Sequence, residues 1–184
     1  MNTPLAERMR PKSLKEYVGQ EHLIGTKGGL TPILKSGNLP SMILWGPPGT
    51  GKTTLARLLA HQKERPFYQI SAINSGVKEI RDILQKAEHS EGLFSNKSSL
   101  LFIDEIHRFS KSQQDSLLGA VEKGSITLIG ATTENPSFEV INALLSRCQV
   151  YILNPLDKSQ LQQLISNALD QDVEIKNKKI EILE

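Results

Sequence analysis

Eight consecutive residues have the types and spacing that hold a chain of phosphates. The pattern G-x-x-x-x-G-K-[ST] is met by Gly46-Pro47-Pro48-Gly49-Thr50-Gly51-Lys52-Thr53. Glycines let the backbone curl so that successive N–H groups face an anion, and a following helix adds the positive end of its dipole. In such a loop we expect Lys52 to reach the β- and γ-phosphates and the Thr53 hydroxyl to bind Mg²⁺. The run therefore predicts a nucleoside triphosphate site.

The segments on either side of this run have the character that a phosphate loop needs. The apolar stretch 41–45 reads as a buried strand, and 52–61 is rich in strong helix formers. Strand, glycine loop and helix is the context that separates a phosphate loop from a plain Gly/Pro turn, the alternative interpretation. Thr54, the first residue beyond the pattern, is grouped with the nucleotide-binding residues.

An acidic pair follows a second apolar stretch. Asp104 and Glu105 come directly after 99–103, a run that reads as a strand buried on both faces. Carboxylates at the carboxyl end of such a strand face the crevice in which parallel sheets bind ligands. We expect Asp104 to hold Mg²⁺ and Glu105 to polarise the attacking water, the alternative being two solvated acids. Asp-Glu-Ile-His, completed by His107, also occurs in helicases but is too short to predict strand separation.

Two further side chains could serve the same reaction. Thr133 ends the next apolar strand, where a hydroxyl can hydrogen-bond the γ-phosphate or the water; threonines that merely end a strand are the alternative. Arg147 precedes the last predicted strand. Its guanidinium could act on a neighbouring subunit's nucleotide, as arginine fingers do. A surface or salt-bridged arginine is the alternative.

The spacing of apolar residues predicts the elements that position these groups. Strands are expected at 41–45, 67–70, 99–103, 125–130 and 149–153, and helices at 52–61, 76–90, from 110, near 138–146 and at 157–170. Ser110 and Gln113 form a capping-box signature for the third helix. Strands that alternate with helices imply an α/β fold, a parallel five-stranded sheet with helices on both faces.

The two ends of the chain differ from this regular middle. We divide the chain into an N-terminal segment (1–40), a core (41–154) and the beginning of a helical domain (155–184). The last segment has too few elements to enclose a core of its own. The apolar residues of the first segment suit one wall of a base pocket or simple packing on the sheet.

Composition excludes several classes of protein. The 184 residues have a net charge of +2, so a DNA contact would need a local basic patch. A single cysteine, Cys148, excludes an internal disulfide framework and fits a reducing compartment. No apolar run approaches the roughly 20 residues of a membrane span, and the N-terminus lacks a signal-peptide core. These features predict a cytoplasmic protein without a membrane partner.

The motifs together resemble those of the AAA+ ATPases of the clamp-loader clade. The resemblance covers nearly all of 1–153 and rests on four stretches: Arg10-Pro11 to Gly19-Gln20, Leu44 to Thr53, Phe102 to Phe109, and Gly130 to Phe138. The run Thr-Thr-Glu-Asn-Pro-Ser-Phe and the tripeptide Ser-Arg-Cys point to this branch.

The resemblance also implies roles for single positions. Thr133 falls at the sensor 1 position, and Arg147 falls at the trans-acting arginine. Ser71 falls near the polar residue that holds the catalytic glutamate idle in some members. Tyr17 and Val18 would border the adenine. The helix from Gly76 would face a central channel, so that its Lys78 and Arg81 touch DNA phosphates or, alternatively, form a solvated helix face.

The function implied by the resemblance is that of a DNA-dependent ATPase. It would act in replication-fork maintenance, recombination and repair, using ATP/ADP and Mg²⁺. The implied partners are single-stranded, gapped or forked DNA in the nucleoid, further copies of the chain and single-stranded-DNA-binding protein. The family's helical lid, with its second sensor arginine, and its oligomer-forming region are incomplete here, so we expect weak hydrolysis and a monomer.

Two other functions remain open from the sequence. One is a clamp-loader-like assembly subunit that binds nucleotide with little hydrolysis, against which the complete set Lys52, Thr53, Asp104 and Glu105 argues. The other is a small-molecule kinase, which would need an acceptor pocket rather than a water-activating glutamate. Release of free phosphate without an acceptor would separate a hydrolase from a kinase.

Overall fold

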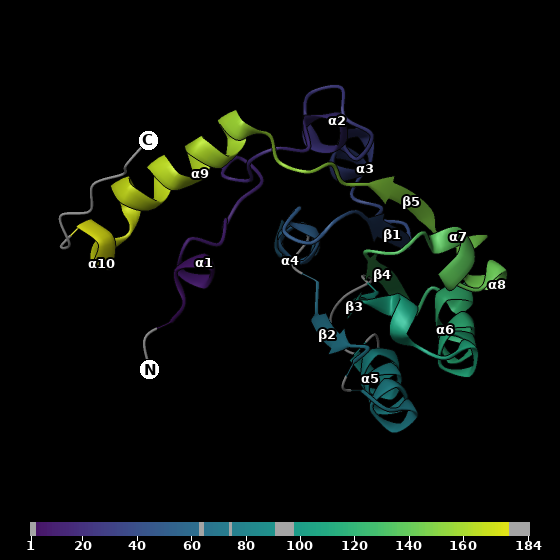
Figure 1. Cartoon of the computed structure of the whole chain (residues 1–184). Coiled ribbons are helices and arrows are strands. Elements are labelled where there is room, and N and C mark those ends of the chain that lie inside the picture. Colours follow the sequence, from purple (N-terminus) through teal and green to yellow (C-terminus); the bar gives the residue numbers. More distant parts are fainter. Residues whose placement is uncertain (1–2, 63–64, 74, 91–97, 177–184) are drawn as a thin grey trace. The chain divides into compact units, whose positions relative to one another are not determined.

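A computed structural model describes residues 3–62, 65–73, 75–90 and 98–176 (Figure 1). The contacts group the chain into two compact units. The sheet unit comprises 20–155, and the terminal unit comprises 1–19 together with 156–184. Residues 20–40, which the sequence assigned to a separate N-terminal segment, thus group with the sheet. Among the described residues, no helix is both long enough and apolar enough to span a bilayer.

The sheet unit contains a five-stranded parallel sheet. Its strands are β1 (Met42–Trp45), β2 (Phe67–Ser71), β3 (Ser99–Asp104), β4 (Ile126–Thr132) and β5 (Gln149–Ile152). Their order across the sheet is β2-β3-β4-β1-β5, so β1 lies between β4 and β5 (Figure 1). This confirms the predicted parallel α/β class. Because all strands run the same way, the residues that end them lie along one edge.

Helices pack on both faces of this sheet. The helices of the sheet unit are α2 (Glu21–Ile24), α3 (Thr31–Ser36), α4 (Lys52–Gln62), α5 (Val77–Ser90), η1 (Ile106–Arg108), α6 (Lys111–Lys123), α7 (Pro136–Glu139) and α8 (Asn142–Leu145). Successive residues of a strand point to opposite faces. Leu101 and Ile103 of β3 share a core with α5 and α6, while α4 packs on β3 and β4 from the other side (Figure 1).

Local signals placed the three longest helices of the sheet unit, α4, α5 and α6, within one or two residues. The predicted capping box opens α6: the Ser110 hydroxyl accepts from the Gln113 amide, and the Gln113 side chain accepts from Ser110 N–H. The helix predicted near 138–146 is instead two four-residue helices, α7 and α8. Asn135 caps α7 through its contact with the Ser137 amide, and the backbone is extended at Val140 and Ile141, which ends one helix before the next.

The terminal unit combines both ends of the chain. It contains α1 (Leu5–Arg8), α9 (Lys158–Gln171) and α10 (Val173–Lys176). Asp157 and Gln160 form a second capping box at the start of α9. The Arg8 guanidinium donates two hydrogen bonds to the Asp172 carboxylate, Nε to Oδ2 at 2.7 Å and Nη2 to Oδ1 at 2.9 Å. The expected lid domain stays a prediction.

Candidate active site

The predicted phosphate loop joins β1 to α4 and has the backbone that its glycines allow. Gly49 and Gly51 adopt φ angles of 79° and 90°, in the left-handed region where a residue with a Cβ atom is strained. A Cβ atom at Gly46 would lie only 2.4 Å from the Leu153 carbonyl oxygen. The loop therefore needs glycine at its start, where the backbone passes the end of β5, and at its tip.

Lys52 folds back over this loop. Its Nζ donates to the carbonyl oxygens of Gly46 and Pro47, at 2.7 and 2.9 Å, and the residue is buried. Burial lowers the pKa of Lys52, and the negative charges of Glu105 and Asp104 partly oppose that shift. The ammonium group is therefore near both the loop and the acidic pair, as a phosphate-binding lysine should be.

Asp104 and Glu105 lie where β3 ends, at the same edge of the sheet as the loop. Burial, followed by the charge of Glu105, raises the pKa of Asp104, and Lys52 partly offsets this rise. A divalent cation would favour the charged carboxylate. The Asp104 carboxylate and the Thr53 hydroxyl supply only oxygen atoms, the ligand type that Mg²⁺ prefers, so these residues fit the predicted metal.

Glu105 has an unusual backbone conformation and two neighbouring donors. Its φ of 55° is left-handed, which costs a non-glycine residue about 1 kcal/mol or more and is often found at functional sites. The Thr133 hydroxyl donates to Glu105 Oε2 at 3.3 Å, and His107 Nδ1 lies 3.3 Å from the same oxygen. The structure thus places the Thr133 hydroxyl beside the Glu105 carboxylate. The roles predicted for both residues require them to lie near the same water.

Gln20 ends one of the stretches that carry the family resemblance, but the sequence assigned it no role. It is buried, with a left-handed φ of 62°. Its side chain donates to the Asn154 carbonyl at 2.7 Å and accepts from the Asn154 amide at 2.9 Å, and it lies 3.4 Å from the Thr50 carbonyl. Gln20 therefore links the phosphate loop to the chain after β5. The signal of this role is the burial of a polar residue in an irregular segment, and the sequence alone does not show burial.

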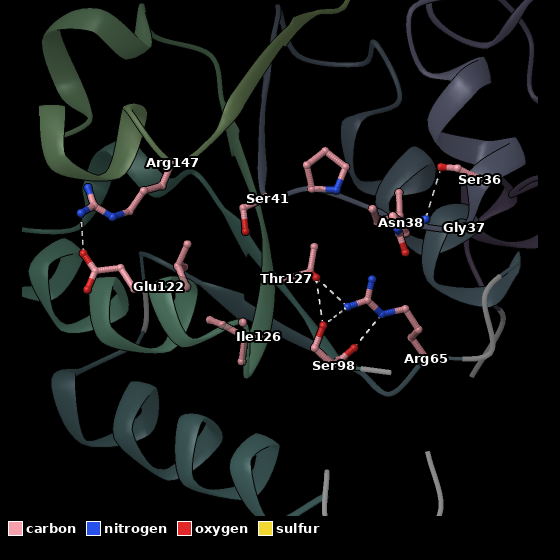
Figure 2. Close-up of a pocket in the computed structure, with 14 residues that line it drawn as sticks. Ser36, Gly37, Asn38, Ser41, Arg65, Ser98, Glu122, Ile126, Thr127 and Arg147 are labelled. Carbon is pink, nitrogen blue, oxygen red and sulfur yellow. Dashed lines mark hydrogen bonds and ion pairs between the residues drawn. The ribbon is translucent and has the colours of Figure 1, made fainter. Parts of the chain in front are cut away.

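Arg147 lies at the opposite edge of the sheet, just before β5 begins. Its Nη2 is 2.5 Å from Glu122 Oε1 (Figure 2), and its Nη1 donates to the Ala143 carbonyl at 2.6 Å. Arg147 lines a cavity of about 1030 Å³, which Arg65 also lines. Figure 2 shows these residues around it. Because the phosphate loop is at the other end of the strands, Arg147 is separated from its own chain's loop, and a role in a neighbouring subunit stays a prediction.

The remaining residues with a predicted role in the site or in DNA binding lie in both units. Tyr17 and Val18 belong to the terminal unit, so their role beside adenine stays a prediction. Lys78 and Arg81 are exposed on α5, which leaves both the DNA contact and the solvated face open. Ser71 pairs with Asp104 in the β2–β3 register, whereas the Glu105 carboxylate is contacted by Thr133 and His107.

The fold and this edge define the class of protein. A parallel sheet with β1 between β4 and β5, a phosphate loop after β1 and an acidic pair after β3 are the features of a P-loop nucleotide-binding ATPase. The profile of the "ATPase family associated with various cellular activities (AAA)" matches residues 42–156. The chain belongs to this AAA family.

Several relatives carry informative names. The chain is 54% identical over 166 residues to "Replication-associated recombination protein A" of Coxiella burnetii and 50% identical over 167 residues to that of Escherichia coli K12. These matches cover 90% and 91% of this chain but 37% of each relative. The chain therefore spans little more than a third of the length of these relatives, and activities of the whole protein do not transfer by similarity alone.

A solved structure has the same architecture. The "RuvB Holliday junction branch migration motor" of Thermotoga maritima superposes with a TM-score of 0.71 at 32% sequence identity. The match covers 88% of this chain and 54% of that chain. The AAA assignment therefore has support from sequence and from fold.

Proposed function

We propose that this chain binds ATP with Mg²⁺ and hydrolyses it, with Glu105 as the base that polarises water. The observation that carries this proposal is the grouping at one edge of the sheet: the phosphate loop follows β1, Asp104 and Glu105 lie where β3 ends, and Thr133, directly after β4, donates to Glu105. Lys52 and the loop residues would bind the phosphates. Thr53 and Asp104 would hold Mg²⁺, which neutralises charge on the β- and γ-phosphates during transfer.

We further propose that the ATPase acts on DNA during replication-fork maintenance and recombination. Support comes from the printed names of the relatives and from the exposed cations Lys78 and Arg81 of α5. Phosphate contacts of this kind are independent of sequence and weaken with salt. The active assembly would contain several copies, with Arg147 of one copy reaching the nucleotide of the next, and single-stranded-DNA-binding protein would be a partner at the fork.

Two substitutions test the ATPase. Lys52→Ala should abolish binding of a fluorescent ATP analogue, because the loop loses its cation. Glu105→Gln should retain binding and lose phosphate release by roughly 100-fold or more, the usual contribution of a general base. The matched controls are the same substitutions at exposed residues: Lys111→Ala for Lys52→Ala and Glu21→Gln for Glu105→Gln. Both controls should behave as wild type. Wild-type nucleotide affinity in Lys52→Ala would contradict the phosphate-loop assignment.

Phosphate release should be measured over a range of protein concentrations, because self-association would complete a shared site. Mixing Arg147→Ala with Lys52→Ala subunits should restore some release if Arg147 acts in trans, and no recovery at any ratio would contradict that role. Nucleotide binding without phosphate release at every concentration would instead favour the assembly-subunit function. Loss of DNA stimulation in Lys78→Ala and Arg81→Ala, but not in Lys35→Ala, would support the DNA contact.

A further inference from the structure

His107 is a nearly buried histidine next to the candidate base. Its side chain is 7% exposed and lies on η1, the short turn that follows Glu105. Its Nδ1 atom is 3.0 Å from the Thr132 hydroxyl and 3.3 Å from Glu105 Oε2. One ring nitrogen thus faces both the end of β4 and the carboxylate that would activate water.

The surrounding groups favour one ring nitrogen of His107 as the protonated one. The Thr132 hydroxyl has a single hydrogen, which it donates to the Glu134 carbonyl at 3.2 Å, and it accepts from the Glu134 amide at 3.0 Å. With its hydrogen placed on this carbonyl, the hydroxyl can accept from His107 Nδ1 at 3.0 Å. An ionised Glu105 can only accept as well. The approach of Nδ1 to Glu105 Oε2 thus fits a His107 that carries its proton on Nδ1, with the Thr132 hydroxyl as a second acceptor.

Two polar atoms of the site converge on the same oxygen of Glu105. The Thr133 hydroxyl and His107 Nδ1 both approach Oε2, each at 3.3 Å. Among the contacts of the described residues, none falls on the other oxygen, Oε1. A carboxylate held by two donors on one oxygen presents the other in a fixed direction, and a general base must lie within hydrogen-bond reach of the proton it removes.

The backbone that carries His107 is itself fixed. The left-handed Glu105 allows the tight turn in which Arg108 N–H donates to the Glu105 carbonyl at 2.8 Å. Ile106, on this turn, is fully buried over Gly130 of β4, where a Cβ atom would lie 3.0 Å from Ile106 Cδ1 and 2.7 Å from Ile43 Cδ1. This packing holds the turn against β4 and leaves His107 little freedom.

We propose that His107 is a positioning residue for hydrolysis, donating from Nδ1 to Glu105 Oε2 so that Oε1 takes the proton of the attacking water. The inference rests on the proposed ATPase function. In that step the water oxygen bonds to the γ-phosphorus and the bond from this phosphorus to the β–γ bridging oxygen breaks. ADP leaves with the electron pair, and the water proton passes to Oε1. His107 itself loses and gains no proton.

The kinetic test compares two replacements of His107. His107→Phe keeps a ring but removes the donor, and we expect kcat to fall by roughly 10- to 100-fold with KM for ATP within about twofold, because a small misplacement of a catalytic group has effects of this order. His107→Asn places an amide N–H near the position of Nδ1 and should recover most of kcat. His61→Phe, at an exposed histidine of α4, is the matched control and should behave as wild type.

A merely structural role would give a different pattern. If His107→Phe changed KM alone, or if His107→Asn lost as much kcat as His107→Phe, the positioning role would be wrong. Unfolding followed by the fluorescence of the single tryptophan, Trp45, shows whether each variant is folded. If His107→Phe does not fold, the rate of His107→Asn relative to wild type decides, because a conserved donor should preserve kcat to within about threefold.

A second measurement does not depend on hydrolysis. Long-range ¹H–¹⁵N NMR spectra of the ¹⁵N-histidine-labelled chain report which ring nitrogens are protonated. A protonated Nδ1 on His107, in the neutral ring or the imidazolium, supports the proposal, and an unprotonated Nδ1 overturns it. Absence of phosphate release from the wild-type chain together with a protonated Nδ1 would contradict the ATPase function and leave the His107–Glu105 contact standing.

Discussion

The interactions that stabilise the sheet unit internally differ from those that stabilise the terminal unit internally. In the sheet unit β4 is buried along its whole length, and the first five residues of β3 are buried as well. In the terminal unit α9 has no buried residue, and Leu161 and Ile165 are 48% and 50% exposed. Its described polar contacts include the α9 capping box and the ion pairs of Arg8 with Asp172 and Glu174.

This difference indicates where stability and function reside. Burial of apolar surface is the main driving force of folding, so the sheet unit can hold a strained Glu105 and a tight phosphate loop in place. An amphipathic helix gains most of its stability by packing its apolar face. The apolar residues of α9 are only partly covered within the described part of the chain: Leu161 and Ile165 are exposed, and Leu164, Ala168 and Leu169 are half-buried. We therefore expect substitutions in the two units to have very different effects.

The largest effect is expected in the centre of the sheet. Leu101→Ala removes a fully buried side chain of β3 that packs with α5 and α6. The lost burial and the remaining cavity should lower the free energy of unfolding by about 2–5 kcal/mol. Urea denaturation followed by Trp45 fluorescence measures this in the sheet unit, and a cost below about 1 kcal/mol would contradict the described packing.

A somewhat smaller effect is expected at a buried polar residue of the same unit. Gln114 is 1% exposed; its Nε2 donates to the carbonyls of Phe109 and Glu139, and its Oε1 accepts from the Ile141 amide at 2.9 Å. Gln114→Leu would leave these groups unsatisfied, at about 1–3 kcal/mol. The same urea titration should give a cost that does not change between low and high salt, because no charge is involved.

A charged contact of the terminal unit should instead respond to pH and salt. The Arg8 guanidinium holds the pKa of Asp172 at about 2, below the ordinary 3.8. Because the folded-state pKa is the lower one, this contact stabilises the unit above the ordinary pKa and is lost as pH falls through about 2. Amide hydrogen exchange of α9 and α10 should be faster in Asp172→Asn than in wild type near neutral pH.

The difference in amide hydrogen exchange between wild type and Asp172→Asn should shrink in acid and in high salt. Asp170→Asn is the matched control, since Asp170 is an exposed residue of α9 two positions before Asp172, and it should leave exchange unchanged. Equal exchange in wild type and Asp172→Asn near neutral pH would show that the ion pair does not hold the two chain ends together.

The smallest effect is expected on the exposed stripe of α9. Leu161→Ala makes the same chemical change as Leu101→Ala but at a half-exposed position. Exposed substitutions usually change stability by less than about 0.5 kcal/mol, and alanine is also a strong helix former. Hydrogen exchange of α9 should therefore stay close to wild type. A large increase in exchange would show that Leu161 is packed and would remove the contrast between the units.

The sequence by itself determined the features that depend on neighbouring residues. The phosphate loop is local, because glycine positions set its backbone and Lys52 and Thr53 follow at fixed spacing. The five strands and the longer helices follow from runs and periods of apolar residues, and the Ser110 cap follows from one spacing of three. Alternation of these elements was enough to predict a parallel sheet with helices on both faces, because parallel strands need helical crossovers.

The tertiary structure alone decided what depends on distant residues. The order β2-β3-β4-β1-β5 places Thr133 and Thr132 next to residues that follow β3, which creates the contacts of Glu105 and His107. It also separates Arg147 from the phosphate loop and brings Gln20 to Asn154 across 134 positions. No local sequence pattern encodes such pairs, because they form only after the crossover connections and the packing of the core determine which strands are neighbours.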